Sequence, residues 1–221
     1  MSIAVRTDSD IQTAVQDELE WTPDVDAAGI GVSVEDGAVS LSGEVDSYAE
    51  RRAAVRAAQR VRGVSTVADN LNVHPKHSYS VSTTDIAKEV EHALRWAAFV
   101  PDSVKAELEG HTVTLTGEVG WEYQRNAAKR AIQYLRGVYM VNDLITLKAR
   151  PSADDTERRI TEAITRNAQL DADAIHVSVD GTTVTLTGTV HSWAEKQQAG
   201  HAAWSSPHVM HVDNRISLRA W

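Results

Sequence analysis

The six-residue string "TVTLTG" occurs twice in this chain, at residues 112–117 and again at 183–188. A weaker copy, "AVSLSG", occupies residues 38–43, so the three strings lie 74 and 71 positions apart. Similarity at a nearly fixed spacing is typical of a chain built from repeated structural units. The repeat therefore predicts three equivalent substructures within the 221 residues.

The similarity continues on both sides of the string, with no gap inside the hairpin segments. These segments are 30–45, 104–119 and 175–190. A helix-like stretch precedes each hairpin, at residues 10–21, 85–96 and 156–167. The third aligned set, which we expect to form a closing strand, covers 62–73, 136–147 and 208–218. Nearly the whole chain is therefore accounted for by three copies.

Hydrophobic spacing predicts the elements inside one copy. Apolar residues recur every fourth position between 11 and 19, which is helix spacing, and alternate between 30 and 45, which is strand spacing. Helix spacing returns between 54 and 61. We therefore predict an α+β chain of three tandem α-β-β-α-β modules, each a three-stranded mixed sheet backed by two helices. The predicted module boundaries are 8–74, 83–148 and 155–219.

Each copy places a glycine inside its second predicted strand, at Gly43, Gly117 and Gly188. Glycine in a strand interior usually marks a bulge or a close approach of another backbone. In the string itself, the Val and Leu side chains should face the helices and the Thr side chains the other face of the sheet.

Composition excludes several classes of function. The absence of cysteine excludes disulfides, thiol nucleophiles and Cys-ligated metals. A formal charge of −9 argues against a general nucleic-acid-binding protein, which needs a basic face. No apolar run approaches the roughly 20 residues that a membrane span needs. The first ten residues lack the apolar core of a signal peptide, so we expect a cytoplasmic protein.

The motifs resemble those of the BON (bacterial OsmY and nodulation) domain family. The matching features are "VTLTGEV" or "VTLTGTV" after a turn, an Ala-rich helix such as residues 50–64, and a closing "V-x-N-x-L/I". The resemblance implies a non-enzymatic protein that is associated with osmotic and envelope stress and contacts phospholipid surfaces. It also implies potassium as a possible ligand, because one family member is a cytoplasmic potassium-binding protein.

A search for chemistry supports a non-enzymatic protein. No G-x-S-x-G or S-x-x-K nucleophile motif is present. The tightest histidine pair, His208 and His211, lies on a predicted strand, where side chains three apart tend to face opposite ways. Surface or half-buried imidazoles are favoured over a zinc site. We predict no catalytic residues and no metal site, while a potassium site made of backbone carbonyls would leave no side-chain signature.

Positions where the copies differ are the candidates for function, because all three copies need the same fold. Copies one and three start their second helix with capping boxes, Ser47-x-x-Glu50 and Ser192-x-x-Glu195, whereas copy two has Trp121 in the Ser position. Net charge also differs: −6 for residues 1–78, 0 for 79–151 and −3 for 152–221. The middle copy should therefore be repelled least by an anionic partner.

In copy two, Tyr123, Arg130 and Tyr134 share the helix face opposite the Ala-rich stripe. Two amphipathic rings beside a cation suit a lipid headgroup region. With Trp121, these residues form the predicted lipid- or partner-binding site. The alternative is a solvated face with incidental tyrosines.

In copy three, Trp193, Gly200 and Trp204 lie at positions i, i+7 and i+11 of the second helix. A glycine between two tryptophans should leave a shallow notch, and exposed tryptophans usually mark an interface. We expect packing against another copy, with contact to a membrane or partner as the alternative.

These observations favour a non-catalytic, stress-associated binding protein that docks on an anionic phospholipid surface or on a protein partner there. The alternative function is cytoplasmic potassium binding or sensing.

Overall fold

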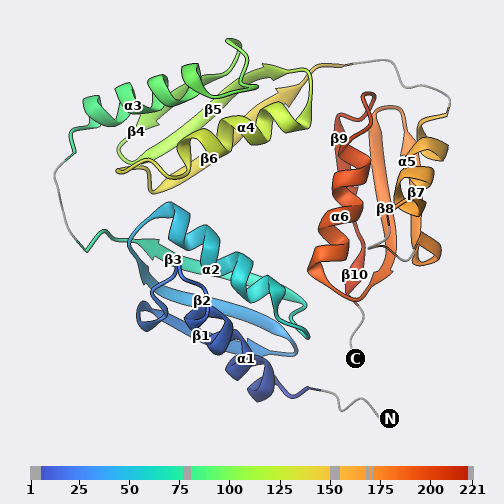
Figure 1. The fold of residues 1–221 in the computed structure, drawn as a ribbon, viewed down its shortest axis with the longest axis horizontal. Helices are drawn as coiled ribbons and strands as arrows, with labels where there is room; N and C mark the ends of the chain where they lie inside the picture. The colour runs from blue at the N-terminus through green and yellow to red at the C-terminus, as the bar shows by residue number, and fades with distance from the viewer. Residues whose placement is uncertain (1–5, 77–80, 150–154, 168–169, 171, 219–221) are drawn as a thin grey trace. The chain divides into compact units, whose positions relative to one another are not determined.

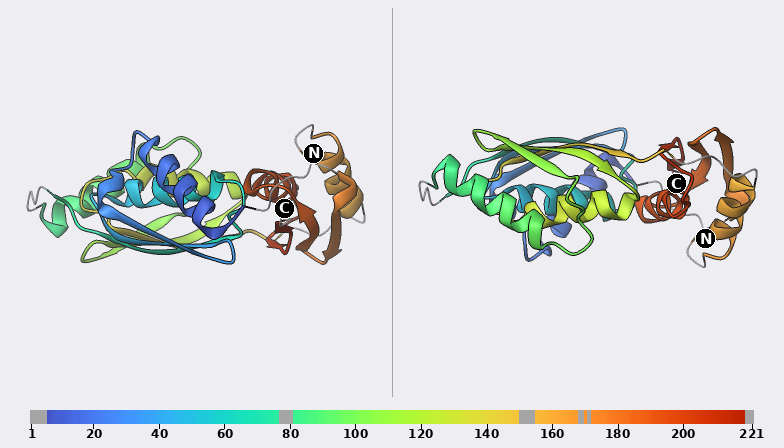
Figure 2. Two further views of the ribbon diagram at one scale, coloured as in Figure 1. Left: turned by 90° about the horizontal axis from the view of Figure 1, so that it is seen from below. Right: turned by 90° about the horizontal axis from the view of Figure 1, so that it is seen from above.

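The computed structural model describes residues 6–76, 81–149, 155–167, 170 and 172–218. These residues form three α+β modules, each with its own β-sheet and two helices (Figure 1). The predicted fold class is therefore confirmed. For modules 1 and 2, Figure 2 shows both helices on the same side of the strands.

Module 1 has the predicted order of elements. They are α1 (Asp8–Glu20), β1 (Ile30–Glu35), β2 (Ala38–Val45), α2 (Tyr48–Arg60) and β3 (Thr66–Val73), with a short 3-10 turn, η1 (Ala27–Gly29), before β1. Strand β2 is central: it pairs antiparallel with β1 and parallel with β3. The repeated string, which reads "AVSLSG" in module 1, thus lies in the middle strand of the sheet.

Local sequence explains where α1 begins and which side it buries. Thr7 is the N-cap: its hydroxyl accepts a hydrogen bond from the Asp10 backbone N–H, and the Asp10 carboxylate accepts one from the Thr7 N–H at 2.9 Å. This reciprocal capping satisfies two N–H groups that the helix itself cannot pair. Ile11, Val15 and Leu19 then fall on one side and are buried.

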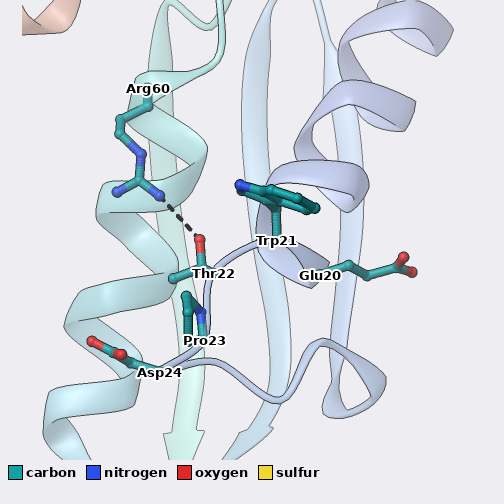
Figure 3. A pocket seen from close by; sticks show the side chains of 6 residues that line it. All are labelled: Glu20, Trp21, Thr22, Pro23, Asp24 and Arg60. Carbon is teal, nitrogen blue, oxygen red and sulfur yellow. Dashed lines mark hydrogen bonds between the residues drawn. The ribbon is translucent and has the colours of Figure 1, made fainter.

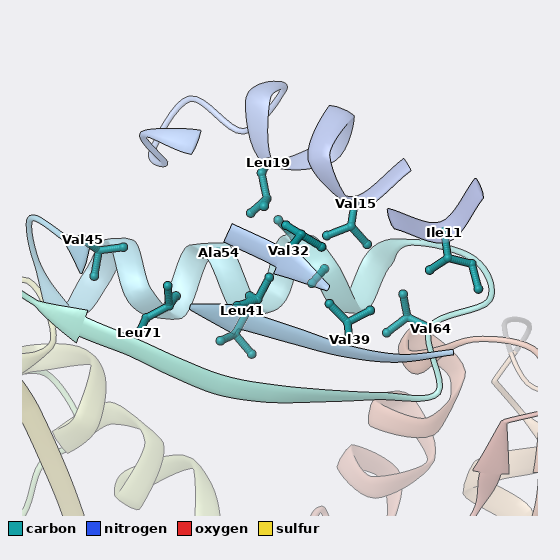
Figure 4. Close-up of a cluster of buried hydrophobic side chains, with 13 residues drawn as sticks. Ile11, Val15, Leu19, Val32, Val39, Leu41, Val45, Ala54, Val64 and Leu71 are labelled. Atoms are coloured by element: carbon teal, nitrogen blue, oxygen red, sulfur yellow. The ribbon is translucent and has the colours of Figure 1, made fainter. Parts of the chain in front are cut away.

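The core of module 1 lies between the sheet and the two helices (Figure 4). Val39 and Leu41 of β2 are at most 1% exposed, and they point toward the helices. The labelled members of the cluster are Ile11, Val15, Leu19, Val32, Val39, Leu41, Val45, Ala54, Val64 and Leu71. The matching Val113, Leu115, Val184 and Leu186 of the other two modules are fully buried. The string "TVTLTG" recurs because the same core is built three times.

Module 2 repeats this arrangement with a shorter first strand. Its elements are α3 (Thr83–Trp96), β4 (Lys105–Glu109), β5 (Thr112–Val119), α4 (Glu122–Ile132) and β6 (Met140–Leu147). The strand order is β4-β5-β6, with β4 antiparallel to β5.

Module 3 differs in its last strand, which is divided in two. Its elements are α5 (Thr156–Thr165), η2 (Ala172–Ala174), β7 (Ile175–Asp180), β8 (Thr183–Val190), α6 (Trp193–Trp204), β9 (His211–Asn214) and β10 (Ser217–Leu218). Both β9 and β10 pair parallel with β8. The Arg215 N–H donates to the Leu186 carbonyl at 2.8 Å between them, so the two short strands continue one line of pairing.

The glycines of the repeated string mark close backbone approaches, as predicted. Gly43, Gly117 and Gly188 have φ values of 123°, 124° and 126°. A Cβ at these positions would lie 2.0 to 2.2 Å from the carbonyl oxygen that precedes the first strand of the same module. The hairpin can therefore close against its own entry loop only if this residue is glycine.

A polar contact links the second helix to the last strand in each module, and the groups that make it differ between modules. In module 1, Arg51 Nε lies 3.0 Å from Asp69 Oδ2, and in module 2, Lys129 Nζ lies 3.0 Å from Asp143 Oδ2. In module 3 the equivalent strand residue is Asn214, whose side-chain amide donates to the α6 backbone at 2.9 Å. An ion pair in two modules is replaced by a neutral hydrogen bond in the third.

Candidate functional site

The structure offers surfaces for binding more readily than a reaction centre. Across the described ranges, no group of three or more His, Asp or Glu side chains is arranged to hold a metal ion. None of the helices in those ranges is long and apolar enough to cross a membrane.

Three of the four residues predicted to bind in module 2 are exposed. Tyr123 is 49% and Tyr134 68% exposed, and Arg130 is exposed between them in the sequence. Tyr134 lies in the turn just beyond the end of α4 at Ile132. Trp121 is half-buried and directly precedes α4, in the position that the capping serine holds elsewhere.

The structure adds two aromatic residues from another part of the module. Phe99, in the loop after α3, is 69% exposed and meets the Tyr123 ring edge-on, with 5.8 Å between ring centroids. Trp96, the last residue of α3, is 75% exposed, and its ring lies 5.9 Å from that of His92. Phe99 also has a positive φ of 69°, which is uncommon for a bulky residue. We call Trp96, Phe99, Tyr123, Arg130 and Tyr134 the module 2 aromatic face.

The spacing within the second helix does not reveal Phe99 and Trp96, because Trp96 ends the first helix of the module and Phe99 lies in the loop after it. A signal was present, because Phe99 is the single Phe of the chain and takes the place of Asp24 in copy one.

The cations of module 2 differ in how far they are neutralised. Lys129 and Arg125 both face Asp143, at 3.0 and 3.7 Å, and their charge is used within the module. Among the described residues no carboxylate pairs with Arg130. Its guanidinium therefore remains available to an anionic partner at the module 2 aromatic face.

In module 3 the predicted interface residues sit closer to their own core than expected. Trp193 is half-buried, with Lys196 Nζ 5.4 Å from its ring centroid, and Trp204 packs against the module 3 core. Gly200 is buried, and a Cβ there would lie 3.3 Å from Asn214 Nδ2. Gly200 thus makes room for the link between α6 and β9 and faces its own sheet, which differs from the open notch that was predicted.

Comparison with known proteins identifies the repeats. The family model described as "BON domain" matches residues 7–75, 82–149 and 152–220. The chain is 32% identical over 145 residues to the "Osmotically-inducible protein Y" of Escherichia coli (strain K12), covering 63% of this chain and 72% of that protein.

Two solved structures of CdsD, a structural protein of the type III secretion system of Chlamydia trachomatis, were also matched. One is its C-terminal domain, with a TM-score of 0.27 and 11% identity, covering 97% of this chain and all of that one. The other has a TM-score of 0.28 and 13% identity, covering 95% of this chain and 92% of that one.

Proposed function

The chain belongs to the BON domain family, as three tandem BON domains distantly homologous to osmotically-inducible protein Y, and from this premise we propose that it docks on anionic phospholipid surfaces. The module 2 aromatic face makes the contact, and the protein acts as a non-catalytic, stress-associated binding protein. The observation that carries the proposal is the contact between two exposed aromatic rings, Phe99 and Tyr123, on the module that also carries the exposed Arg130.

The rings suit an interfacial position. Phe99 and Tyr123 touch each other while both remain about half or more exposed, so they present one continuous apolar edge to the surroundings. Tyrosine has an apolar ring and a polar hydroxyl, which favours the boundary between headgroups and acyl chains. A phenylalanine beside it adds apolar area that gains free energy when it leaves water.

The charge of the module suits the same partner. Residues 79–151 carry no net charge, whereas 1–78 carry −6 and 152–221 carry −3. A neutral module with Arg130 at its aromatic face meets less repulsion from an anionic surface than its neighbours do. Each basic side chain near such a surface contributes about 1 kcal/mol at physiological ionic strength.

Vesicle flotation tests the proposal. We expect the full chain to float with phosphatidylglycerol-containing vesicles and not with pure phosphatidylcholine vesicles. Tyr123→Ala combined with Arg130→Ala should weaken binding by about tenfold or more, because a ring contact and a cation are lost together.

Arg56→Ala provides the matched control. Arg56 is the module 1 equivalent of Arg130 and is also exposed, but Ala49 and Arg60 hold the positions equivalent to Tyr123 and Tyr134. Unchanged binding of the double variant, or an equal loss with Arg56→Ala, would contradict docking by the module 2 aromatic face.

A further inference from the structure

A groove in module 1 lies where the end of α1 meets the end of α2 (Figure 3). Its volume is about 690 Å³. The residues that line it are Glu20, Trp21, Thr22, Pro23, Asp24 and Arg60. The groove lies within one module, so its shape depends only on that module's fold.

One of the residues that line this groove is among the most exposed large apolar side chains in the described structure. Trp21 is 83% exposed, directly after the end of α1. Its indole has no ring contact and no side-chain hydrogen bond among the described residues. A ring of this size left in water loses the free energy that burial would supply, and such residues mark interaction sites.

Glu20 and Asp24 bring two carboxylates to the groove. Figure 3 shows their side chains extending away from the Trp21 ring in opposite directions, and within the described ranges neither forms an ion pair. The cation of the groove, Arg60, is already satisfied: its Nε donates to Glu18 at 2.8 Å and its Nη2 to the Thr22 hydroxyl at 3.0 Å. Two carboxylates of the groove therefore remain unneutralised.

Module 2 carries a different chemistry at the same position of the fold. Trp96 is the equivalent of Trp21, but Arg95 stands in place of Glu20 and Phe99 in place of Asp24. Both tryptophans are exposed, at 75% and 83%. The tryptophan is thus shared by the two modules, while the two carboxylates of module 1 are replaced in module 2 by a phenylalanine and by an arginine that is paired with Glu91.

We propose that the module 1 groove binds a basic segment of a protein partner, with one arginine or lysine side chain seated on Trp21 and further basic side chains of the segment near Glu20 and Asp24. The face of an indole ring attracts a cation placed over it, and a guanidinium is favoured for this position. The carboxylates of Glu20 and Asp24 accept hydrogen bonds from other basic side chains of the segment. The charge of −6 on residues 1–78 draws such a partner toward the groove. This inference is independent of the lipid docking proposed for module 2.

Peptide titration of the full chain tests the inference. The probe is an acetylated, amidated pentapeptide, Gly-Arg-Gly-Arg-Gly, and the control peptide has Gln in place of Arg. The indole N–H signals are followed by NMR, with Trp21 and Trp96 assigned from Trp→Phe variants. We expect a saturable shift of the Trp21 signal with the arginine peptide only, and no shift of the Trp96 signal.

Charge variants test the site itself. Glu20→Gln combined with Asp24→Asn should weaken the peptide by roughly three- to tenfold, because two surface carboxylates are lost. The matched control is Glu35→Gln with Asp36→Asn, which removes the same charge from the exposed hairpin turn of the same module. This control should change the affinity by less than about twofold.

Three results would overturn the inference. In the first, the Trp21 signal does not move with the arginine peptide. In the second, both double variants weaken binding equally, which indicates only non-specific attraction by the charge of the module. In the third, Trp21→Ala lowers binding to anionic vesicles as much as Tyr123→Ala does, which assigns the tryptophan to lipid. Because Trp21 is largely exposed, its replacement leaves the core intact.

Discussion

Replacing Gly117 by alanine tests whether the repeated string is fixed by a close backbone approach. Gly117 has a φ of 124°, and a Cβ on it would lie 2.2 Å from the Ser103 carbonyl oxygen and 3.1 Å from the Val104 Cα. Both neighbours are backbone, so neither can move without displacing the start of β4. Gly110, in the hairpin turn of the same module, is the matched control: its φ is 57°, and nothing lies within 4 Å of a Cβ built there.

The expected cost follows from these geometries. Gly110→Ala should destabilise module 2 by about 1–2 kcal/mol, because it places a side chain on a left-handed backbone. Gly117→Ala should cost about 1–3 kcal/mol for its sparsely populated φ and about 1–3 kcal/mol more for the overlap of its Cβ with backbone atoms. We expect about 4 kcal/mol in total, a large part of what a domain of this size has in reserve. Module 2 should melt at least 10 °C lower with Gly117→Ala than with Gly110→Ala, since 1 kcal/mol shifts the midpoint of a small domain by about 4–8 °C.

The assay must report on module 2 alone, because three modules need not unfold together. Native-state hydrogen exchange of the Val113 and Leu115 amides in β5 does so, and the Val39 and Leu41 amides in β2 report on module 1. We expect Gly117→Ala to accelerate exchange in β5 and to leave β2 unchanged. Equal protection of β5 in the two alanine variants would refute the argument that backbone contact requires this glycine.

Further predictions concern the links between elements and the aromatic face. Asp143→Ala should destabilise module 2 by about 1.5–3 kcal/mol, because it breaks a charged link, whereas Asn214→Ala breaks a neutral hydrogen bond and should destabilise module 3 by about 0.5–1.5 kcal/mol. In thermal unfolding, added salt should reduce the loss of stability caused by Asp143→Ala and leave the loss caused by Asn214→Ala unchanged. Hydrogen bonding from Lys76 lowers the pKa of Asp26 below its ordinary 3.8, and the same bond raises the pKa of Lys76 above 10.5. The stability that the Asp26 carboxylate contributes is fully present above pH 3.8 and is lost as the pH falls through its lowered pKa, whereas the stability that the Lys76 ammonium contributes is fully present below pH 10.5 and is lost as the pH rises through its raised pKa. Lys76→Ala should return the Asp26 pKa toward 3.8 in an NMR titration. An unchanged Asp26 titration curve would contradict the contact. Phe99→Ser should weaken flotation with anionic vesicles by about fivefold or more through lost apolar area, without lowering the melting temperature, because the ring is 69% exposed; full binding by this variant would remove Phe99 from the aromatic face.

The sequence was sufficient for the fold because each element depends on local spacing. Residues 10–21 were expected to form a helix, and α1 runs over Asp8–Glu20 because Thr7 and Asp10 cap it earlier than the apolar pattern alone indicates. The division of the last strand into β9 and β10 was not predicted, since the aligned segment 208–218 has the same apolar spacing as its equivalents.

The candidate surfaces were less predictable because they join residues that are distant in the chain. Tyr123 could be placed on an exposed helix face from spacing alone, but its contact with Phe99 depends on the path of the loop after α3. Gly200 was expected to open a notch, yet its surroundings are set by Asn214, which comes from a strand and not from the helix. Helix periodicity gives the direction of a side chain, and only the tertiary structure gives its neighbours.

The three modules show how one scaffold can support different chemistry. The core positions of the central strand cannot vary freely, because Val39 and Leu41, like their equivalents, are packed between sheet and helices with at most 1% exposure. The loop after the first helix has no such constraint, and it is there that Asp24 is exchanged for Phe99 beside a retained tryptophan. A substitution in this loop changes the charge and apolar area offered to a partner without opening a cavity in the core. Binding preference can therefore diverge between modules while their stability is maintained by the same packing.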